Sequence, residues 1–170
     1  MFRIIMDNDQ PIFRPVRRQD RLWSETAARN LLDTGEFGTL SMCGTNGYGY
    51  GIPISYVTEN NSIYFHCAPE GYKLMCMQAN NRACFTVVGH THVIPGGFTT
   101  EYESVMVFGK IDMNLSDEEK QHALELLGAK YNPGYEQRAA RYIAGSFART
   151  YVLRLDIEHL TGKTKKLKTK

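Results

Sequence analysis

Apolar and polar residues alternate along several stretches of the chain, and this period of two is typical of strands with one buried face. Turn residues separate the first stretches: Asn46-Gly47 suits a hairpin, and Asn60-Asn61 marks a second one. The pattern therefore predicts strands over Phe37–Cys43, Tyr50–Thr58, Ser62–Cys67, Arg82–Gly89, Tyr102–Asp112 and Phe147–Ile157.

Helix signals interrupt these strands. Ser24 is a good N-cap for a helix that ends at Gly35, and Ser116 with Glu119 forms a capping box for a helix that runs to about Tyr131. We also predict a short helix over Tyr135–Ala144 and another that has Lys73 in its first turn. Residues 1 to about 18 are expected to form an extended arm, because Pro11 and Pro15 disfavour a helix there.

Hairpin-linked strands with a few helices between them favour an antiparallel barrel with helices outside. A parallel nucleotide-binding sheet requires a regular strand–helix alternation, which this chain lacks. We therefore predict an α+β fold built on a barrel, with residues 1–170 as a single domain.

Composition narrows the classes of partner. The net charge of +2 gives no field that indicates nucleic acid, and no apolar run is long enough to cross a membrane. The only charge run is the basic tail from about Lys163 to Lys170, which we expect to be a solvated, frayed terminus. The N-terminus has no signal-peptide core. The four cysteines lie in apolar segments without a Cys-x-x-Cys pair, so we expect reduced thiols and a cytoplasmic protein.

The segment from Ile63 to Lys73 carries the strongest chemical signal. A strand ends at His66-Cys67, Gly71 permits close backbone approach, and a helix follows with Lys73 in its first turn. A lysine beside the free N–H groups of a helix start is unfavourable unless an anion lies between them. A phosphate satisfies both groups. The alternative is that Lys73 simply points into water.

Other motifs have plain structural interpretations. Strand alternation puts His66 on the face opposite Ile63 and Phe65, where a hydrogen-bonded structural histidine is the commoner case. Pro53 removes a ladder donor, so its strand lies at an edge or a bulge. The glycine run from Gly44 to Gly51 lacks the helix and the lysine of a phosphate loop. No zinc spacing is present, and we predict no metal site.

Taken in order, seven segments resemble the flavin-binding split-barrel proteins related to pyridoxamine 5′-phosphate oxidase, most similar to their nitroimidazole-resistance branch. The resemblance covers Arg17 to Lys163 and implies an antiparallel Greek-key split β-barrel with peripheral helices. It also implies a homodimer with FMN at the subunit interface, and FAD is possible. The segments are Phe37-Gly-Thr-Leu-Ser, Ile52-Pro-Ile-Ser-Tyr-Val, Ile63-Tyr-Phe-His-Cys-Ala, Gly71-Tyr-Lys-Leu, Cys84-Phe-Thr-Val, Tyr102-Glu-Ser-Val-Met-Val-Phe-Gly and Thr161-Gly-Lys.

The resemblance also implies a set of site residues. One group would line the flavin or approach it from a neighbouring strand, and another would flank its phosphate. His66 would be the catalytic residue that donates a proton or polarises a substrate. The implied cofactor-binding residues are Pro53, Ile54, Ser55, Tyr56, His66, Cys67, Tyr72, Lys73 and Ser104.

Two departures from the family pattern limit the implied activity. The C-terminal arginine segment that holds the substrate phosphate of the oxidases is replaced by Thr161-Gly-Lys and the basic tail, which argues against vitamin B6 oxidation. Tyr72 stands where the oxidases tend to have a second basic residue. We expect a flavin-dependent oxidoreductase, nitroreductase-like, that acts on a small aromatic substrate. The alternatives are a non-catalytic flavin carrier or sensor, and a haem-handling split-barrel protein.

Overall fold

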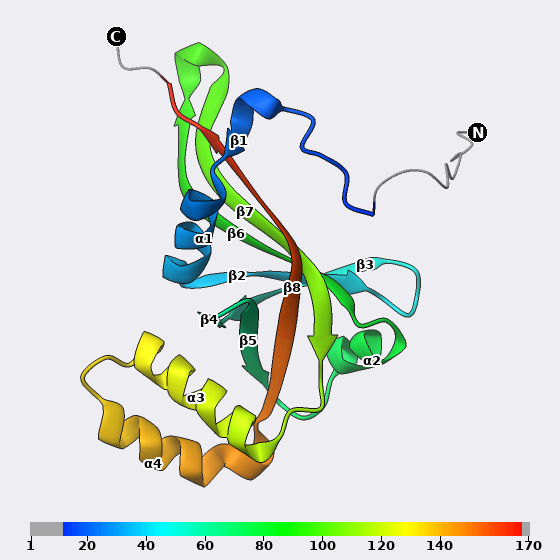
Figure 1. Cartoon of the computed structure of the whole chain (residues 1–170), viewed down its shortest axis with the longest axis vertical. Helices are drawn as coiled ribbons and strands as arrows, with labels where there is room; N and C mark the ends of the chain where they lie inside the picture. The colour runs from blue at the N-terminus through cyan, green and yellow to red at the C-terminus, as the bar shows by residue number, and fades with distance from the viewer. Residues whose placement is uncertain (1–11, 168–170) are drawn as a thin grey trace.

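One antiparallel sheet, curled into a half-open barrel, organises the chain (Figure 1). The structure is a computed structural model that describes residues 12–167. The strand order is β3-β2-β6-β7-β8-β5-β4, and β1 pairs with β8 beside this path. The strands are β1 (Leu22–Trp23), β2 (Phe37–Cys43), β3 (Gly49–Ser55), β4 (Val57–Glu59), β5 (Ser62–Cys67), β6 (Arg82–Ile94), β7 (Thr99–Asp112) and β8 (Tyr151–Lys165).

Four α-helices lie around this sheet in the described part of the chain. In Figure 1, α1 runs beside the upper part of β8, α2 lies at the opposite side, and α3 and α4 form a pair at the lower end. The α+β split-barrel prediction is confirmed. The helices are α1 (Glu25–Thr34), α2 (Tyr72–Ala79), α3 (Asp117–Tyr131) and α4 (Glu136–Ser146).

Local signals gave several boundaries correctly. Ser24 caps α1 by accepting a hydrogen bond from the Ala27 N–H at 3.3 Å, and Ser116 caps α3 through the Glu119 N–H at 3.2 Å. The predicted bounds of β2 and β5 are those observed. The predicted strand over Tyr50–Thr58 is instead divided at Tyr56 into β3 and β4.

The long strands exceed the prediction. β6 and β7 continue to a turn at Pro95–Gly97, and the resulting hairpin projects beyond the barrel (Figure 1). β8 starts at Tyr151 and runs to Lys165, where it pairs with both β7 and β1. The prediction of a frayed tail from Lys163 is therefore wrong for residues 163–165. These residues pair with β7, and Lys163 also pairs with β1, so they have backbone partners that a free terminus lacks. The arm predicted for residues 1–18 lies outside the described residues up to position 11, and residues 12–18 have no helix or strand.

Two apolar clusters stabilise the fold. The larger fills the concave side of the sheet around fully buried Phe85, with Phe65 and Tyr56 at 5.1 and 4.7 Å between ring centroids. The smaller packs α3 and α4 against the other face of β5 and β8 through Leu127, Ile143 and other apolar side chains. The strand β5 therefore has an apolar cluster on each side.

Tyr56 joins the helices to the sheet. Its side chain is fully buried, and its hydroxyl donates a hydrogen bond to the carbonyl of Leu32 in α1. Its backbone N–H donates to the hydroxyl of Tyr131, the last residue of α3, at 2.9 Å. The Tyr131 hydroxyl in turn donates a hydrogen bond to the carbonyl of Glu36, at 2.5 Å. The ammonium of Lys130 lies 4.1 Å from the centre of the Tyr56 ring.

Tyr131→Phe tests this joint. Removal of the hydroxyl leaves the N–H of Tyr56 without its partner inside the protein, so we expect a loss of about 1–3 kcal/mol in the free energy of unfolding. Urea denaturation followed by circular dichroism measures it. Tyr135→Phe removes the same hydroxyl from a side chain that is 62% exposed and serves as the control. Equal stability of the two variants would contradict the role of Tyr131.

Candidate functional site

The convex face of the sheet combines short side chains with a few large, mostly uncharged ones. Residues that alternate with the buried core project to this outer face, and the strand registers align them in rows. One row across five strands consists of Pro53, Thr39, Thr86, Met106 and Thr161. The adjacent row consists of Gly51, Ser41, Cys84, Phe108 and His159.

Large apolar side chains of this outer face are open to solvent in the single chain. Phe37 is 62% exposed, Val88 61% and Met106 41%. Contiguous exposed apolar surface on a soluble domain is typical of an interaction site. Small side chains beside them, such as Thr39 and Gly51, allow a planar group or another backbone to approach the strands closely.

Pro53 lies on β3, which is the last strand on its side of the described sheet. The prediction that Pro53 occupies an edge strand is confirmed, since β2 is the neighbour of β3 on one side and the strand order ends on the other. The outward edge of β3 leaves backbone groups of residues 53–55 without a ladder partner in the described chain. Ile54 itself packs partly into the larger apolar cluster.

The start of α2 has the geometry of an anion cradle. Gly71 is the N-cap with φ +126°, its helix start carries no side-chain cap, and the first turn holds no acidic residue. A Cβ built on Gly71 would lie 3.6 Å from the ammonium nitrogen of Lys73, so this side chain folds back over the helix start. Free N–H groups and an ammonium thus face the same space, which fits a phosphate.

Tyr72 anchors the cradle to the hairpin between β2 and β3. Its ring packs edge-on against Tyr50 with 5.0 Å between centroids, and its hydroxyl accepts a hydrogen bond from Thr45 at 3.2 Å. The side chain of Tyr72 therefore positions the helix start. Burial raises the pKa of the neighbouring Cys67 thiol, while the positive charge of Lys73 acts in the opposite direction. The thiol is thus protonated at neutral pH.

His66 and Ser55 belong to a different depression. They line a groove of about 680 Å³ between the end of β5 and the α3–α4 pair, together with Tyr131, Tyr142 and Arg138. The predicted face of His66 is observed, since Tyr64 on the same side packs toward the helices. No residue of α2 lines this groove, so His66 and the start of α2 belong to different surface features.

One predicted site residue needs correction. The Tyr56 side chain is fully buried against α1 and Phe85, so it cannot line a cofactor outside the protomer. Burial of the phenol also raises its pKa. The break between β3 and β4 is the place where Tyr56 turns inward.

Ser104 projects from β7 to the outer face, next to Val88 on β6 and Lys163 on β8. Pro53 lies on the same face, three strands away, which corresponds to roughly 14 Å at ordinary strand spacing. The predicted residues therefore form three groups: Pro53 with Ser104 on the outer face, Cys67 with Tyr72 and Lys73 at α2, and Ser55 with His66 in the groove. Sequence reasoning missed Tyr131 and Arg138, which reach the groove only through packing of α3 and α4.

Within residues 12–167, no group of three His, Cys, Asp or Glu side chains has an arrangement suited to a metal ion. No helix in that range is long and apolar enough to cross a membrane.

The chain belongs to the pyridoxamine 5′-phosphate oxidase family. The model of that family matches residues 24–164, which include β2 to β7, all of β8 except Lys165, and all four α-helices described above. The family predicted from the sequence motifs is thereby confirmed. Among curated protein sequences no match was found.

Solved structures share the fold. A candidate 5-nitroimidazole antibiotic resistance protein from Bacteroides thetaiotaomicron is 24% identical, with a TM-score of 0.68 over 84% of this chain and 85% of that one. A FAD-binding protein from Mesorhizobium loti is 22% identical, with a TM-score of 0.62 over 86% and 98%. A FAD and heme binding protein from Mycobacterium smegmatis is 20% identical, with a TM-score of 0.73 over 85% and 72%.

The pKa of His66 gives a testable pH dependence. Partial loss of water around the ring lowers the pKa of His66 below the ordinary 6.5. The unfolded chain then binds this proton at a higher pH than the folded chain, so acidification below about pH 6.5 reduces stability. We expect His66→Asn to lose stability less steeply than the wild type between neutral and mildly acidic pH, measured by urea denaturation. Parallel curves, or an NMR titration midpoint of His66 at or above 6.5, would refute this.

Proposed function

We propose that the protein binds a flavin, FMN in the first instance, with the phosphate at the start of α2 and the ring on the outer face of the sheet. The observation that carries the proposal is the cradle of Gly71 and Lys73, where N–H groups and an ammonium face one space without an acidic partner in the helix's first turn. Flavin binding by similarly folded proteins from Mesorhizobium loti and Mycobacterium smegmatis supports it.

The protein's own groups would bind and orient the cofactor. Lys73 and the first N–H groups of α2 would hold the phosphate, and Tyr72 would keep this helix start in place. The unpaired edge of β3 at residues 53–55 offers backbone donors and acceptors to the polar rim of a planar heterocycle. The flavin would supply the electron transfer that no protein side chain provides.

We assign the α3–α4 groove to the substrate of an oxidoreductase. Its lining of Tyr131, Tyr135 and Tyr142 suits a small aromatic molecule, which is consistent with a nitroreductase-like activity. The lowered pKa of His66 leaves its imidazole neutral at pH 7, so one ring nitrogen carries a proton and the other accepts one. Such a group polarises a bound substrate and exchanges a proton with it.

The absorbance spectrum of the purified protein distinguishes the alternatives. Flavin bands, with FMN released on heating, support the proposal. Flavin without oxidation of any nicotinamide donor indicates a carrier or sensor. A Soret band indicates a haem protein, in which the neutral imidazole of His66 would face iron. A colourless protein that does not take up added FMN would refute the flavin assignment.

Substitutions at the cradle test the phosphate contact. We expect Lys73→Ala to weaken FMN binding by about tenfold or more, because a charge-assisted contact is lost. Gly71→Ala should also weaken it, since a methyl group would enter the space before the Lys73 ammonium and φ +126° is unfavourable for alanine.

Fluorescence titration of FMN measures both effects. Gly47→Ala is the matched control: Gly47 also has positive φ, +85°, but a Cβ there meets nothing within 4 Å. The control bears the same kind of backbone strain and should keep its FMN affinity. Full flavin occupancy in Lys73→Ala would remove the basis of the assignment.

We further propose that a second copy of the chain covers the outer face and completes the flavin site as a homodimer. The exposed apolar side chains of Phe37, Val88 and Met106 support this arrangement.

Val88→Asp would place a charge in the centre of the proposed interface, and we expect it to yield monomers that do not retain FMN. Light scattering after size-exclusion chromatography gives the oligomeric state. Val93→Asp is the control, because Val93 is 63% exposed on the projecting hairpin, compared with 61% for Val88. A dimeric Val88→Asp variant, or a monomeric wild type, would contradict the proposal.

A further inference from the structure

One face of α3 and one face of α4 form the walls of the α3–α4 groove. Positions three or four residues apart share a side of a helix, and the lining residues follow this spacing in both helices. The lining residues of the helix pair are Leu124, Leu127, Gly128, Tyr131, Tyr135, Arg138, Ala139, Tyr142, Ile143 and Ser146. The strands β2, β6 and β7, which carry Phe37, Val88 and Met106, contribute no residue to the groove. It is therefore distinct from the surface that a second copy is proposed to cover.

One unpaired cation lies in the groove. Arg138 is the only Lys, Arg, Asp or Glu of residues 12–167 that lines it. In the same range Arg138 forms no ion pair. Arg154 differs in this respect, because its guanidinium binds three carboxylates. The next arginine of α4, Arg141, lies outside the lining, and its Nε donates a hydrogen bond to the carbonyl of Gln137 at 3.4 Å.

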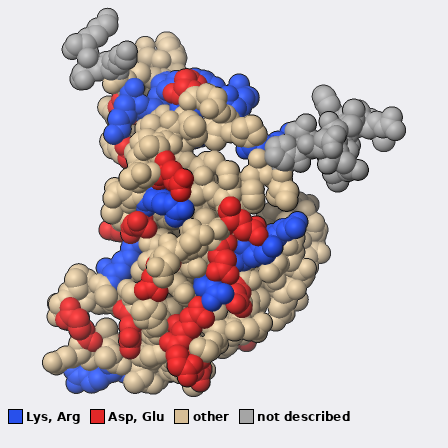
Figure 2. Space-filling view, viewed as in Figure 1, with Lys and Arg blue, Asp and Glu red and all other residues tan. Residues whose placement is uncertain are grey.

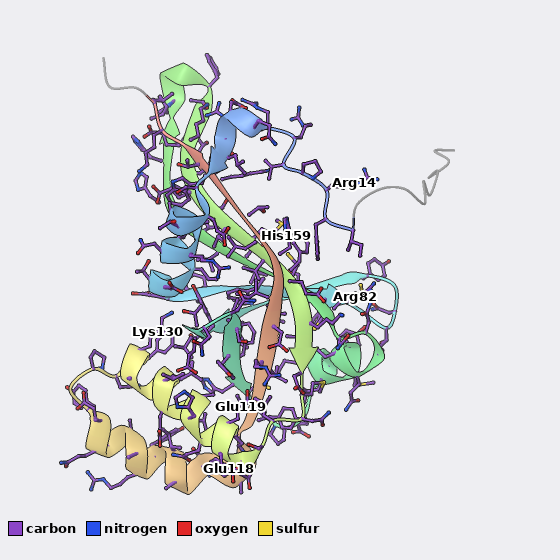
Figure 3. All side chains as sticks on the ribbon, viewed as in Figure 1. Arg14, Arg82, Glu118, Glu119, Lys130 and His159 are labelled. Carbon is purple, nitrogen blue, oxygen red and sulfur yellow. The ribbon has the colours of Figure 1, made fainter. Side chains whose placement is uncertain are left out.

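Acidic residues of the two helices lie away from the groove. Figure 3 shows Glu118 and Glu119 at the start of α3 and Lys130 near its other end. The groove is lined by the second half of α3, beyond these carboxylates. Glu136 at the start of α4 accepts a hydrogen bond from a backbone N–H of the preceding loop at 2.8 Å, and it does not line the groove. A bound ligand is thus the remaining source of an anion for Arg138.

Other polar groups of the groove can donate hydrogen bonds. The neutral imidazole of His66 carries one N–H, and the phenols of Tyr135 and Tyr142 belong to side chains that are 62% and 72% exposed. The Tyr131 hydroxyl is already used, since it donates to the carbonyl of Glu36. A ligand with acceptor oxygens therefore matches the groove better than a cationic one.

The floor of the groove is apolar and flat. Leu124, Leu127 and Ile143 belong to the smaller apolar cluster and are buried. A Cβ built on Gly128 would lie 3.5 Å from the Cβ of Ala139, so the two helices approach closely and no long side chain rises between them. Such a floor, with phenol rings at its rim, suits a planar aromatic ring.

We propose that the α3–α4 groove binds an aromatic carboxylate, with the carboxylate on the fork of Arg138 and the ring on the apolar floor beside Tyr135 and Tyr142. A single guanidinium balances a single negative charge and binds a carboxylate through two parallel hydrogen bonds. As the identity of a substrate, this assignment rests on the proposed function. Ser55 lines the groove at the end of β3, so the ligand would lie beside the strand edge that is proposed to meet the flavin.

NMR titration of the full-length protein with benzoate and with benzamide tests the carboxylate contact. The two probes share a ring and differ in charge, and we expect benzoate to bind about tenfold or more tightly. Arg138→Gln should bind both probes with about equal affinity, and Arg138→Lys should retain only part of the preference, because lysine keeps the charge without the fork. Arg141→Gln removes the same charge from the same helix outside the lining and should keep the wild-type preference. Circular dichroism checks that each variant is folded.

The outcomes separate this inference from the proposed function. Loss of the benzoate preference in Arg138→Gln alone supports the groove, even in a protein that proves to lack flavin, because binding is measured without turnover. A flavin-loaded wild type that binds neither probe, or binds both equally, overturns the inference and leaves the flavin assignment intact. Tighter binding of phenyl phosphate than of benzoate, or equal losses in Arg138→Gln and Arg141→Gln, also overturns it.

Discussion

Burial of one face of the sheet around Phe85 determines what the opposite face presents. Once Leu40, Phe85 and Val107 are fixed in the core, period-two geometry turns Thr39, Thr86 and Met106 outward in a single row. A slip of one residue in any of these strands would exchange the two sets. The proposed flavin surface thus depends on the hydrophobic register of the barrel.

The sequence was most informative for features that depend on residues close together in the chain. Serine caps, Asn-Gly turns and alternating strands such as Phe37–Cys43 depend on neighbours in the chain, and the structure has them as predicted. The extension of β8 to Lys165 was missed, because its polar end is stabilised only by pairing with β7 and β1. Long-range hydrogen bonds of this kind leave no periodic signal.

The sequence indicated candidate site residues, but it did not predict how these residues are arranged in space. Alternation correctly separated His66 from Ile63 and Phe65, but it also implies that His66 and Cys67 face opposite sides of β5. Only the packing of α3 and α4 shows that His66 enters a groove with Ser55. The prediction that Tyr56 lines the cofactor was wrong for a similar reason, because the burial of Tyr56 depends on contacts with Leu32 in α1 and Tyr131 in α3.

The small net charge conceals a strong local separation of charge. Arg154 alone binds Asp112, Glu119 and Asp156, so three carboxylates are concentrated around one guanidinium at the lower part of β8. Many of the acidic side chains in Figure 2 lie in the lower half of that view. Carboxylates bound to Arg154 in this way do not neutralise Lys73 at the start of α2. A chain whose net charge is only +2 can therefore present an unpaired cation at the proposed phosphate site.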